Sequence, residues 1–145
     1  MIEPKDFFTD DQKRKVESAI KAAELNTSGE IRVHLDRTCA GDVLDCAANT
    51  FAKLKMHKTE LRNGVLFYLA INNRKFAILG DVGINTKVSE DFWGNIKVEV
   101  GKLFRQEKFA EGLEKGILMA GEKLKEQFPY QDDDINELSD EISLG

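Results

Sequence analysis

The sequence predicts an α/β protein in which a mixed sheet of about four strands lies between helices, a three-layer α/β/α arrangement. Three observations lead to this class. A segment with apolar residues at helical spacing precedes a strictly alternating strand, and an entirely apolar run follows a second helical segment. The apolar run is separated from the next strand by a short turn, which predicts one β-hairpin within the sheet.

The first half of the chain predicts a helix, a half-buried strand and a second helix. Thr9 and Gln12 have the spacing of a capping box, and apolar residues at helical spacing follow them. Residues 30–36 alternate between apolar and polar side chains, which is typical of a strand with one covered face. His34 lies on the polar side of this strand and is interpreted as a covered surface histidine. Asp42 is placed to cap the second helix.

The middle of the chain predicts the hairpin. Residues 65–71 are all apolar and rich in strand formers, as in a strand that is buried on both faces. Asn72 and Asn73 tolerate positive φ and suit a tight turn. Residues 76–79 then return as the partner strand.

Two helices are predicted after the hairpin. Ser89 precedes two acidic residues, which is a helix-start signal, and an apolar stripe follows. The last helix carries Gly112, Gly116 and Ala120 at intervals of four residues. Because glycine weakens an isolated helix by about 1 kcal/mol, we expect close helix packing at this stripe. Pro129 is predicted to end the helix.

The composition indicates one domain with an acidic tail. The chain has 145 residues, of which 41% are hydrophobic and 32% charged, and a formal charge of −5. We expect a single domain over residues 1–130. Residues 131–145 carry six acidic side chains and no basic one. This is typical either of a disordered tail or of a short helix that docks on this domain, on a second copy or on a protein partner. A neutral body with an acidic tail does not favour nucleic-acid binding.

The sequence carries no evident targeting or membrane segment. The N-terminus lacks a basic stretch followed by an apolar one, and the longest apolar run is far shorter than the roughly 20 residues of a membrane span. We therefore expect a soluble, cytoplasmic protein without a membrane span. Cys39 and Cys46 are too few for a disulfide-rich scaffold or a four-cysteine zinc site, and are interpreted as two reduced thiols.

The chain resembles the TPM domain family in three segments. These are residues 28–33 (Ser-Gly-Glu-Ile-Arg-Val), residues 62–66 (Arg-Asn-Gly-Val-Leu), and residues 74–84, which run from Arg-Lys-Phe-Ala-Ile to Gly-Asp-Val-Gly-Ile. The resemblance extends over residues 9–128. The family includes thylakoid-lumen proteins described as acid phosphatases and a receptor-modulating animal protein. The resemblance implies a sheet of about four strands between helices, and weak phosphatase-type activity.

The chain also departs from the common layout of that family. Many members carry a signal peptide and a later membrane helix, whereas this chain resembles the smaller, soluble branch. Lumenal members have Gly-Tyr-Gly-Leu-Glu where this sequence has Gly-Asp-Val-Gly-Ile-Asn over residues 80–85. Asn85 therefore stands at the position of the family's glutamate.

Common nucleophilic and nucleotide-binding motifs are absent from the sequence. Neither cysteine is followed by an arginine at the spacing of a cysteine phosphatase, and there is no Arg-His-Gly motif. A P-loop, a His-Glu-x-x-His pair and a Gly-x-Ser-x-Gly elbow are missing as well. The sequence therefore does not favour ordinary covalent catalysis.

Oxygen-bearing side chains near the ends of predicted elements are the best candidates for a site. Asp81 follows a strand, while Glu90 and Asp91 open a helix, and such ends meet at the rim of an α/β sheet. Asn63 lies near Asp81 if the hairpin strands are antiparallel, and Asn85 is close along the chain. Because such oxygens suit Ca²⁺ or Mg²⁺, we expect these five residues to form a metal site, with Asp81 and Asp91 as catalytic candidates. Alternatively, Asp81 forms a turn and the other two acids match the helix dipole.

A basic run lies at the end of the second predicted helix. Lys55, Lys58 and Arg62 belong to it, and Arg62 has the forked donor geometry that binds phosphate. These residues are candidates for binding a phosphate group or an acidic partner. Alternatively, they form a solvated helix end whose charge complements the dipole.

Two functional hypotheses follow from the sequence. The first is a soluble TPM-domain protein with an acidic Ca²⁺ or Mg²⁺ site and weak acid-phosphatase-like hydrolysis, without a nucleotide or organic cofactor. The second is a non-catalytic interaction module that acts through the acidic tail or the basic helix end. The resemblance favours the first hypothesis, and the missing nucleophile favours the second.

Overall fold

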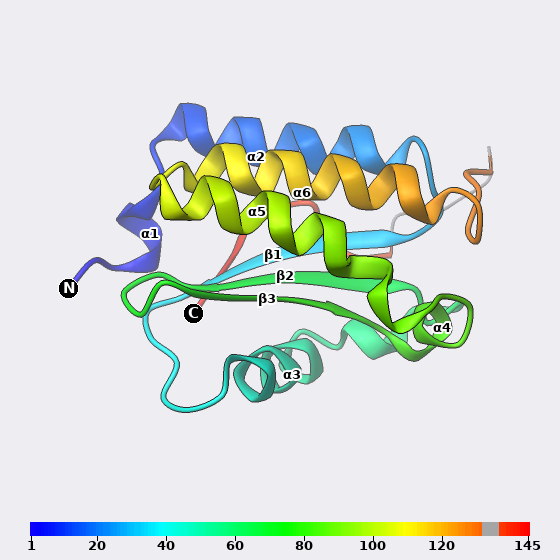
Figure 1. The fold of residues 1–145 in the computed structure, drawn as a ribbon, viewed down its shortest axis with the longest axis horizontal. Coiled ribbons are helices and arrows are strands. Elements are labelled where there is room, and N and C mark those ends of the chain that lie inside the picture. The colour runs from blue at the N-terminus through cyan, green and yellow to red at the C-terminus, as the bar shows by residue number, and fades with distance from the viewer. Residues whose placement is uncertain (132–136) are drawn as a thin grey trace.

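The computed structural model describes residues 1–131 and 137–145, except for the side chain of Glu90, and confirms the α/β class (Figure 1). Four strands form a mixed sheet in the order β3-β2-β1-β4. The strands are β1 (Glu30–Asp36), β2 (Gly64–Ala70), β3 (Lys75–Gly80) and β4 (Ser143–Leu144). The helices are α1 (Pro4–Phe7), α2 (Asp10–Glu24), α3 (Val43–Lys53), α4 (Val82–Asn85), α5 (Gly94–Arg105) and α6 (Phe109–Leu124), with 3-10 helices η1 (Met56–Lys58) and η2 (Glu90–Trp93).

The predicted helix starts in the first half of the chain are confirmed. Thr9 caps α2: its hydroxyl accepts from the Gln12 amide at 3.1 Å, and the Gln12 side chain accepts from the Thr9 amide at 2.9 Å. Asp42 caps α3 through a 2.8 Å bond from the Leu44 amide. These caps satisfy amides that have no partner within the helix.

The hairpin is present, but its turn differs from the prediction. β1 and β2 are parallel, and β2 and β3 are antiparallel. Positive φ falls on Arg74 rather than on the two asparagines. Instead, the Asn72 side chain donates to Arg37 O at 2.9 Å, and Asn73 Oδ1 accepts from the Cys39 amide at 2.7 Å. The asparagines therefore fasten neighbouring loops to the turn.

The sheet separates two cores, as the three-layer prediction requires. α2, α5 and α6 cover one face and α3 covers the other (Figure 1). The larger core packs Ile31, Val33, Phe67 and Ile78 against the three helices. The smaller core, on the α3 side, contains Tyr68. Both faces of β2 are covered, which explains why its seven residues are all buried.

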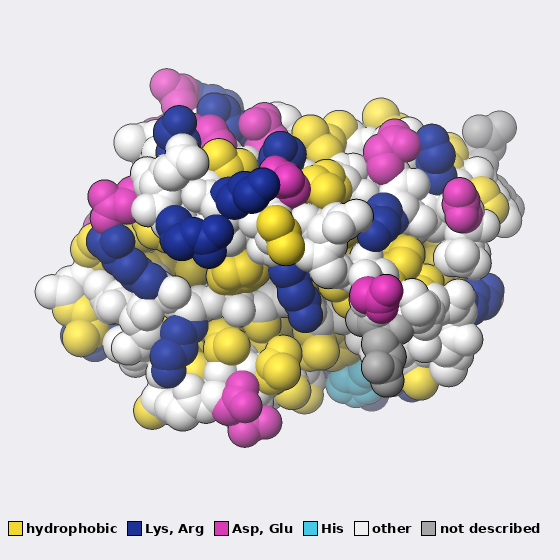
Figure 2. Space-filling view, viewed as in Figure 1, with side chains coloured by type: hydrophobic (Ala, Val, Ile, Leu, Met, Phe, Trp, Pro, Cys, Tyr) yellow, Lys and Arg dark blue, Asp and Glu magenta, His cyan; other side chains and the backbone are white. Residues whose placement is uncertain are grey.

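The outer helices are amphipathic. On the face shown in Figure 2, hydrophobic side chains reach the surface between basic and acidic ones. Val98 on α5 and Leu118 on α6 are exposed apolar residues. The opposite faces of the same helices supply the larger core.

The close packing predicted for the glycine stripe is confirmed. A Cβ atom added at Gly112 would lie 2.6 Å from the Phe104 ring, and one at Gly116 would lie 2.6 Å from Val100 Cγ2. Ala120 is fully buried. The stripe therefore lets α6 approach α5 closely, although the helix ends at Leu124, before Pro129.

The described part of the tail adds a strand to the sheet. The tail was expected to be disordered or a docking helix, and its residues 132–136 lie outside the described part. Residues 143–144 form β4, which pairs in parallel with β1 so that Ser143 lies opposite His34. Glutamates of the body accept tail amides: Glu30 from Leu138 at 2.8 Å and Glu17 from Ile142 at 3.2 Å. The tail docks on its own domain because these carboxylates hold its backbone.

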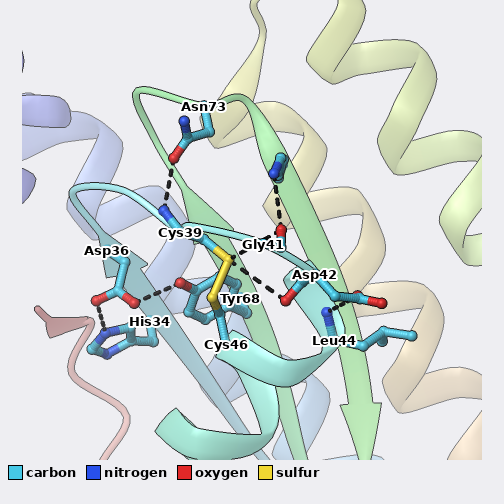
Figure 3. Close-up of a disulfide and its surroundings, with 10 residues drawn as sticks. His34, Asp36, Cys39, Gly41, Asp42, Leu44, Cys46, Tyr68 and Asn73 are labelled. Atoms are coloured by element: carbon cyan, nitrogen blue, oxygen red, sulfur yellow. Dashed lines mark hydrogen bonds and ion pairs between the residues drawn. A yellow bond between two sulfur atoms is a disulfide. The ribbon is translucent and has the colours of Figure 1, made fainter.

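The interpretation of the cysteines as reduced thiols is wrong. Cys39 and Cys46 form a disulfide that closes the loop between β1 and α3 (Figure 3). The loop folds back over Tyr68 in the smaller core, and this brings the two cysteines, seven residues apart, close enough to bond. Disulfides are typical of oxidising compartments, and the cytoplasmic location stays a prediction.

Candidate functional site

The end of β3 and the start of β2 form a polar rim. Because β2 and β3 are antiparallel, the Asp81 amide donates to Gly64 O at 2.9 Å, and Asn63 precedes that residue. The Gly83 amide donates to Arg62 O at 2.9 Å, and a Cβ at Gly83 would lie 2.5 Å from that oxygen. Glycine at position 83 therefore allows α4 to approach the loop before β2.

Arg62 and Asp81 are the central pair of this rim. Arg62 Nε donates to Asp81 Oδ2 at 2.8 Å, and its terminal nitrogen donates to Oδ1 at 2.9 Å. Asp81 is 6% exposed and also caps α4 through the Val82 amide at 2.8 Å. The hydrogen bond to Asp81 raises the pKa of Arg62. Arg62 was predicted to bind a phosphate group or an acidic partner, whereas its fork binds a carboxylate of the chain itself.

The other predicted ligands have different environments. The Asn63 side chain is buried and donates to Ser28 O at 3.2 Å. Asn85 is exposed and donates to Gly80 O at 3.0 Å. Asp91 is exposed in η2, and the side chain of Glu90 lies outside the described part. Within the described residues, no three His, Cys, Asp or Glu side chains are grouped to hold a metal ion.

A cavity of about 460 Å³ lies beside η2, the 3-10 helix that contains Asp91. Lys87, Phe92 and Lys123 are among its lining residues. Lys123 Nζ donates to Phe92 O at 2.6 Å and also lies 5.0 Å from the centre of the Phe92 ring. Glu122 and Glu126 also line the cavity, so its wall carries charges of both signs.

The predicted basic residues beyond Arg62 lie on the α3 side of the molecule. Lys55 follows α3 with positive φ, and Lys58 ends η1. Both are exposed, and neither forms an ion pair with another described residue. They remain candidates for binding an acidic group.

A second polar cluster runs across three neighbouring strands. His34 on β1 lies opposite Tyr68 on β2 and Ser143 on β4. His34 Nδ1 is 2.8 Å from Ser143 Oγ, and His34 Nε2 is 2.7 Å from Asp36 Oδ1. Tyr68 Oη donates to Asp36 Oδ2 at 2.5 Å (Figure 3). Burial and this contact with Asp36 raise the pKa of Tyr68 far above its ordinary value.

This cluster opens into a cavity of about 250 Å³. Thr50, Lys53 and Leu54 line it from α3 and the residue that follows, and residues 143–145 line it from the tail. No sequence pattern predicted this cavity. The strict alternation of β1 placed His34 and Asp36 on one face, but it gave no signal for Ser143, which is 109 residues away.

Together the fold and these sites define a three-layer α/β domain with a charged rim at one end of its sheet and a polar cavity beside its edge strand. The model of the TPM domain matches residues 1–123, and the chain therefore belongs to the TPM domain family. A comparison with curated proteins yields no match. None of the described helices is long and apolar enough to cross a lipid bilayer.

Solved structures similar to this chain share its fold. The BA42 protein of the psychrophilic bacterium Bizionia argentinensis is 46% identical, with both chains fully covered and a TM-score of 0.92. The N-terminal domain of a P. gingivalis protein is 17% identical, with a TM-score of 0.68 over 84% of this chain and 79% of that one. The N-terminal domain of cg2496 from Corynebacterium glutamicum is 14% identical, with a TM-score of 0.65 over 81% of this chain and 74% of that one. The last two similarities concern the fold alone.

Proposed function

We propose that this TPM-domain protein binds a divalent cation, Ca²⁺ or Mg²⁺, at the rim around Asp81. One observation carries the proposal: a buried carboxylate is held at the rim by a helix cap, while its counter-ion, the Arg62 side chain, is 46% exposed. A buried charge needs a partner, but an exposed partner returns to water at low cost. The Asp81 carboxylate can therefore exchange Arg62 for another cation.

The donor chemistry of the rim fits a hard cation. Asp81 and Asn85 offer carboxylate and amide oxygens, which Ca²⁺ and Mg²⁺ prefer, and Asp91 is the further candidate ligand. Few protein ligands converge there, so water would complete the coordination, as is usual for Mg²⁺. We expect weak binding, because the ion competes with Arg62 for Asp81.

The same exchange would supply a phosphate-binding group. When Arg62 leaves Asp81, its forked donors become available for a phosphoryl group, and Lys58 and Lys55 are candidates to add positive charge. Asp91, beside the lysine-lined cavity, is the candidate for proton transfer. A bound divalent cation would polarise a phosphoryl oxygen. We therefore propose weak, cation-dependent hydrolysis of phosphate monoesters.

The cation proposal is tested by titrating Ca²⁺ and Mg²⁺ into the full chain by calorimetry. Asp81→Asn should abolish binding, and Arg62→Gln should tighten it several-fold because the competing guanidinium is removed. Asp42→Asn is a matched control, because Asp42 also caps a helix but has no arginine partner among the described residues. Equal binding by wild type and Asp81→Asn would contradict the proposal.

Hydrolysis requires a separate measurement. With an aryl phosphate and saturating cation, the wild-type rate should exceed that of Asp91→Asn, and also that of Arg62→Gln, although Arg62→Gln binds the cation more tightly. A rate that is equal in all three proteins would exclude catalysis at the rim and leave cation binding as its function.

A second candidate function is binding of an acidic protein partner. It is favoured by the exposed Lys55 and Lys58, which form no ion pair with another described residue. A double Lys55→Glu, Lys58→Glu variant should weaken capture of an acidic peptide, and the weakening should disappear at high salt. Unchanged capture would exclude this surface.

A further inference from the structure

The hydrogen bonds around His34 define which atom carries each proton. Asp36 Oδ2 accepts from the Tyr68 hydroxyl, so Asp36 Oδ1 is left to accept from His34 Nε2. This bond fixes the tautomer with the proton on Nε2. His34 Nδ1 then carries a lone pair and accepts from the Ser143 hydroxyl at 2.8 Å. In the hydrogen-bonded series Ser143–His34–Asp36, Ser143 donates to His34 and His34 donates to Asp36. This is the arrangement of a serine nucleophile, its base and the group that orients the base.

Strand pairing sets the positions of these three residues. His34 and Asp36 are two residues apart on β1, and Ser143 lies directly opposite His34 on β4. The His34 side chain is 8% exposed, so its ring is shielded from bulk water. The Tyr68 ring stacks on the His34 ring at 6.0 Å between centroids. The base is thus held rigidly, as nucleophilic catalysis requires.

We propose that Ser143 is a nucleophile toward small, uncharged carboxylic esters, with His34 as its general base and Asp36 as a positioning residue. In the first step the Oγ–acyl bond forms and the bond to the alcohol breaks. The Oγ proton passes through His34 Nδ1 to the departing alcohol oxygen. Water then attacks the acyl group, gives a proton to His34, and Oγ regains that proton as the carboxylic acid leaves.

The cavity indicates this class of substrate. Its volume of about 250 Å³ lies below the range for drug-sized ligands, so it suits a short acyl chain. Leu54 and Leu144 give apolar walls, and Lys53 supplies positive charge for the oxyanion of the intermediate. Asp36 also lines the cavity and would repel a phosphate dianion. The proposal uses other residues than the rim and stands independently of cation binding.

The proposal is tested by treating the full chain with a fluorophosphonate probe, which modifies activated serines, and locating the adduct by mass spectrometry. The adduct is expected on Ser143 and absent from Ser143→Ala. Ser139→Ala is the matched control, because Ser139 lies in the same tail and accepts from the Glu141 amide instead of contacting histidine. Its labelling should equal that of wild type. No adduct, or an adduct on another serine, would overturn the proposal.

Two further measurements separate catalysis from a structural role. Removing a general base slows such reactions by roughly 100-fold or more. The rates of labelling and of p-nitrophenyl acetate hydrolysis should therefore fall to that extent in His34→Ala. Added imidazole should restore both rates. The His34 Nε2 proton should give a far-downfield NMR resonance that Asp36→Asn removes. If Ser143→Ala keeps the wild-type hydrolysis rate, the assignment of the nucleophile is wrong.

Discussion

The carboxyl groups of Glu24 and Asp140 share a hydrogen bond. Glu24 is the last residue of α2, and Asp140 lies in the docked tail. Two ionised carboxylates cannot share such a bond, so one of them carries a proton when the tail is docked. The contact therefore couples the attachment of the tail to pH.

The stability of the fold is expected to fall as the pH rises from about 5 to 9. Burial and Asp140 raise the pKa of Glu24 to about 9, and burial raises the pKa of Glu30 to about 7. Both carboxyls ionise near pH 4.3 when unfolded. Above that pH the folded chain holds protons that the unfolded chain has released, so the free energy of unfolding declines by at most about 1.4 kcal/mol per pH unit for each proton.

Urea unfolding across this pH range checks the prediction. Glu24→Gln keeps a hydrogen-bonding group beside Asp140 but does not titrate. Its stability should depend less on pH than that of the wild type, above all well above the Glu30 pKa of about 7, where Glu30 is ionised. If the free energy of unfolding changes with pH equally in both proteins, Glu24 is not the protonated partner.

The Arg62–Asp81 pair is expected to contribute to stability as well as to cation binding. Asp81→Ala removes the cap of α4 and leaves Arg62 without its carboxylate, so it should destabilise by about 1–3 kcal/mol in chemical unfolding. Asp42→Ala removes a cap alone and should cost about 1 kcal/mol. If the two losses are equal, the ion pair contributes nothing.

Local features were predictable from the sequence. The Thr9 capping box and the alternation of residues 30–36 act over a few residues, and both lie where expected. The proximity of Asn63 and Asp81 required one further assumption, an antiparallel hairpin, which is correct. The first two predictions succeeded because short-range chemistry determines them, and the third because the hairpin pairing was assumed correctly.

The contacts that the sequence did not reveal join distant residues. Arg62 meets Asp81 across 19 residues after adopting a left-handed backbone conformation, which its side chain gave no reason to expect. The acidic tail was expected to be disordered or to form a short docking helix, because it carries six acidic side chains and no basic one. The structure instead uses tail backbone amides as donors to Glu17 and Glu30. Backbone donors are the same in every sequence, so composition gave no signal that the tail would dock as a strand.

Reduction of the Cys39–Cys46 disulfide should destabilise the protein without unfolding it. The loop it closes is short, and cross-links of this length contribute about 2 kcal/mol by restricting the unfolded chain. The larger core contains neither cysteine and should persist. Urea unfolding with and without a thiol reductant measures the effect. The double variant Cys39→Ala, Cys46→Ala should not respond to the reductant, and a wild-type protein that also does not respond would contradict the prediction.

The packing between α5 and α6 should not tolerate a methyl group at Gly116. The added carbon would lie 2.6 Å from Val100 Cγ2 and 3.0 Å from the Phe67 ring, so a buried helix must shift. Gly116→Ala should therefore destabilise by about 1–3 kcal/mol, although alanine is the better helix former. Gly94→Ala is the control, because its nearest atom is 3.9 Å away at the start of α5. That variant should be neutral or more stable by up to about 1 kcal/mol, and equal effects of the two substitutions in thermal unfolding would show that the helices do not pack this closely.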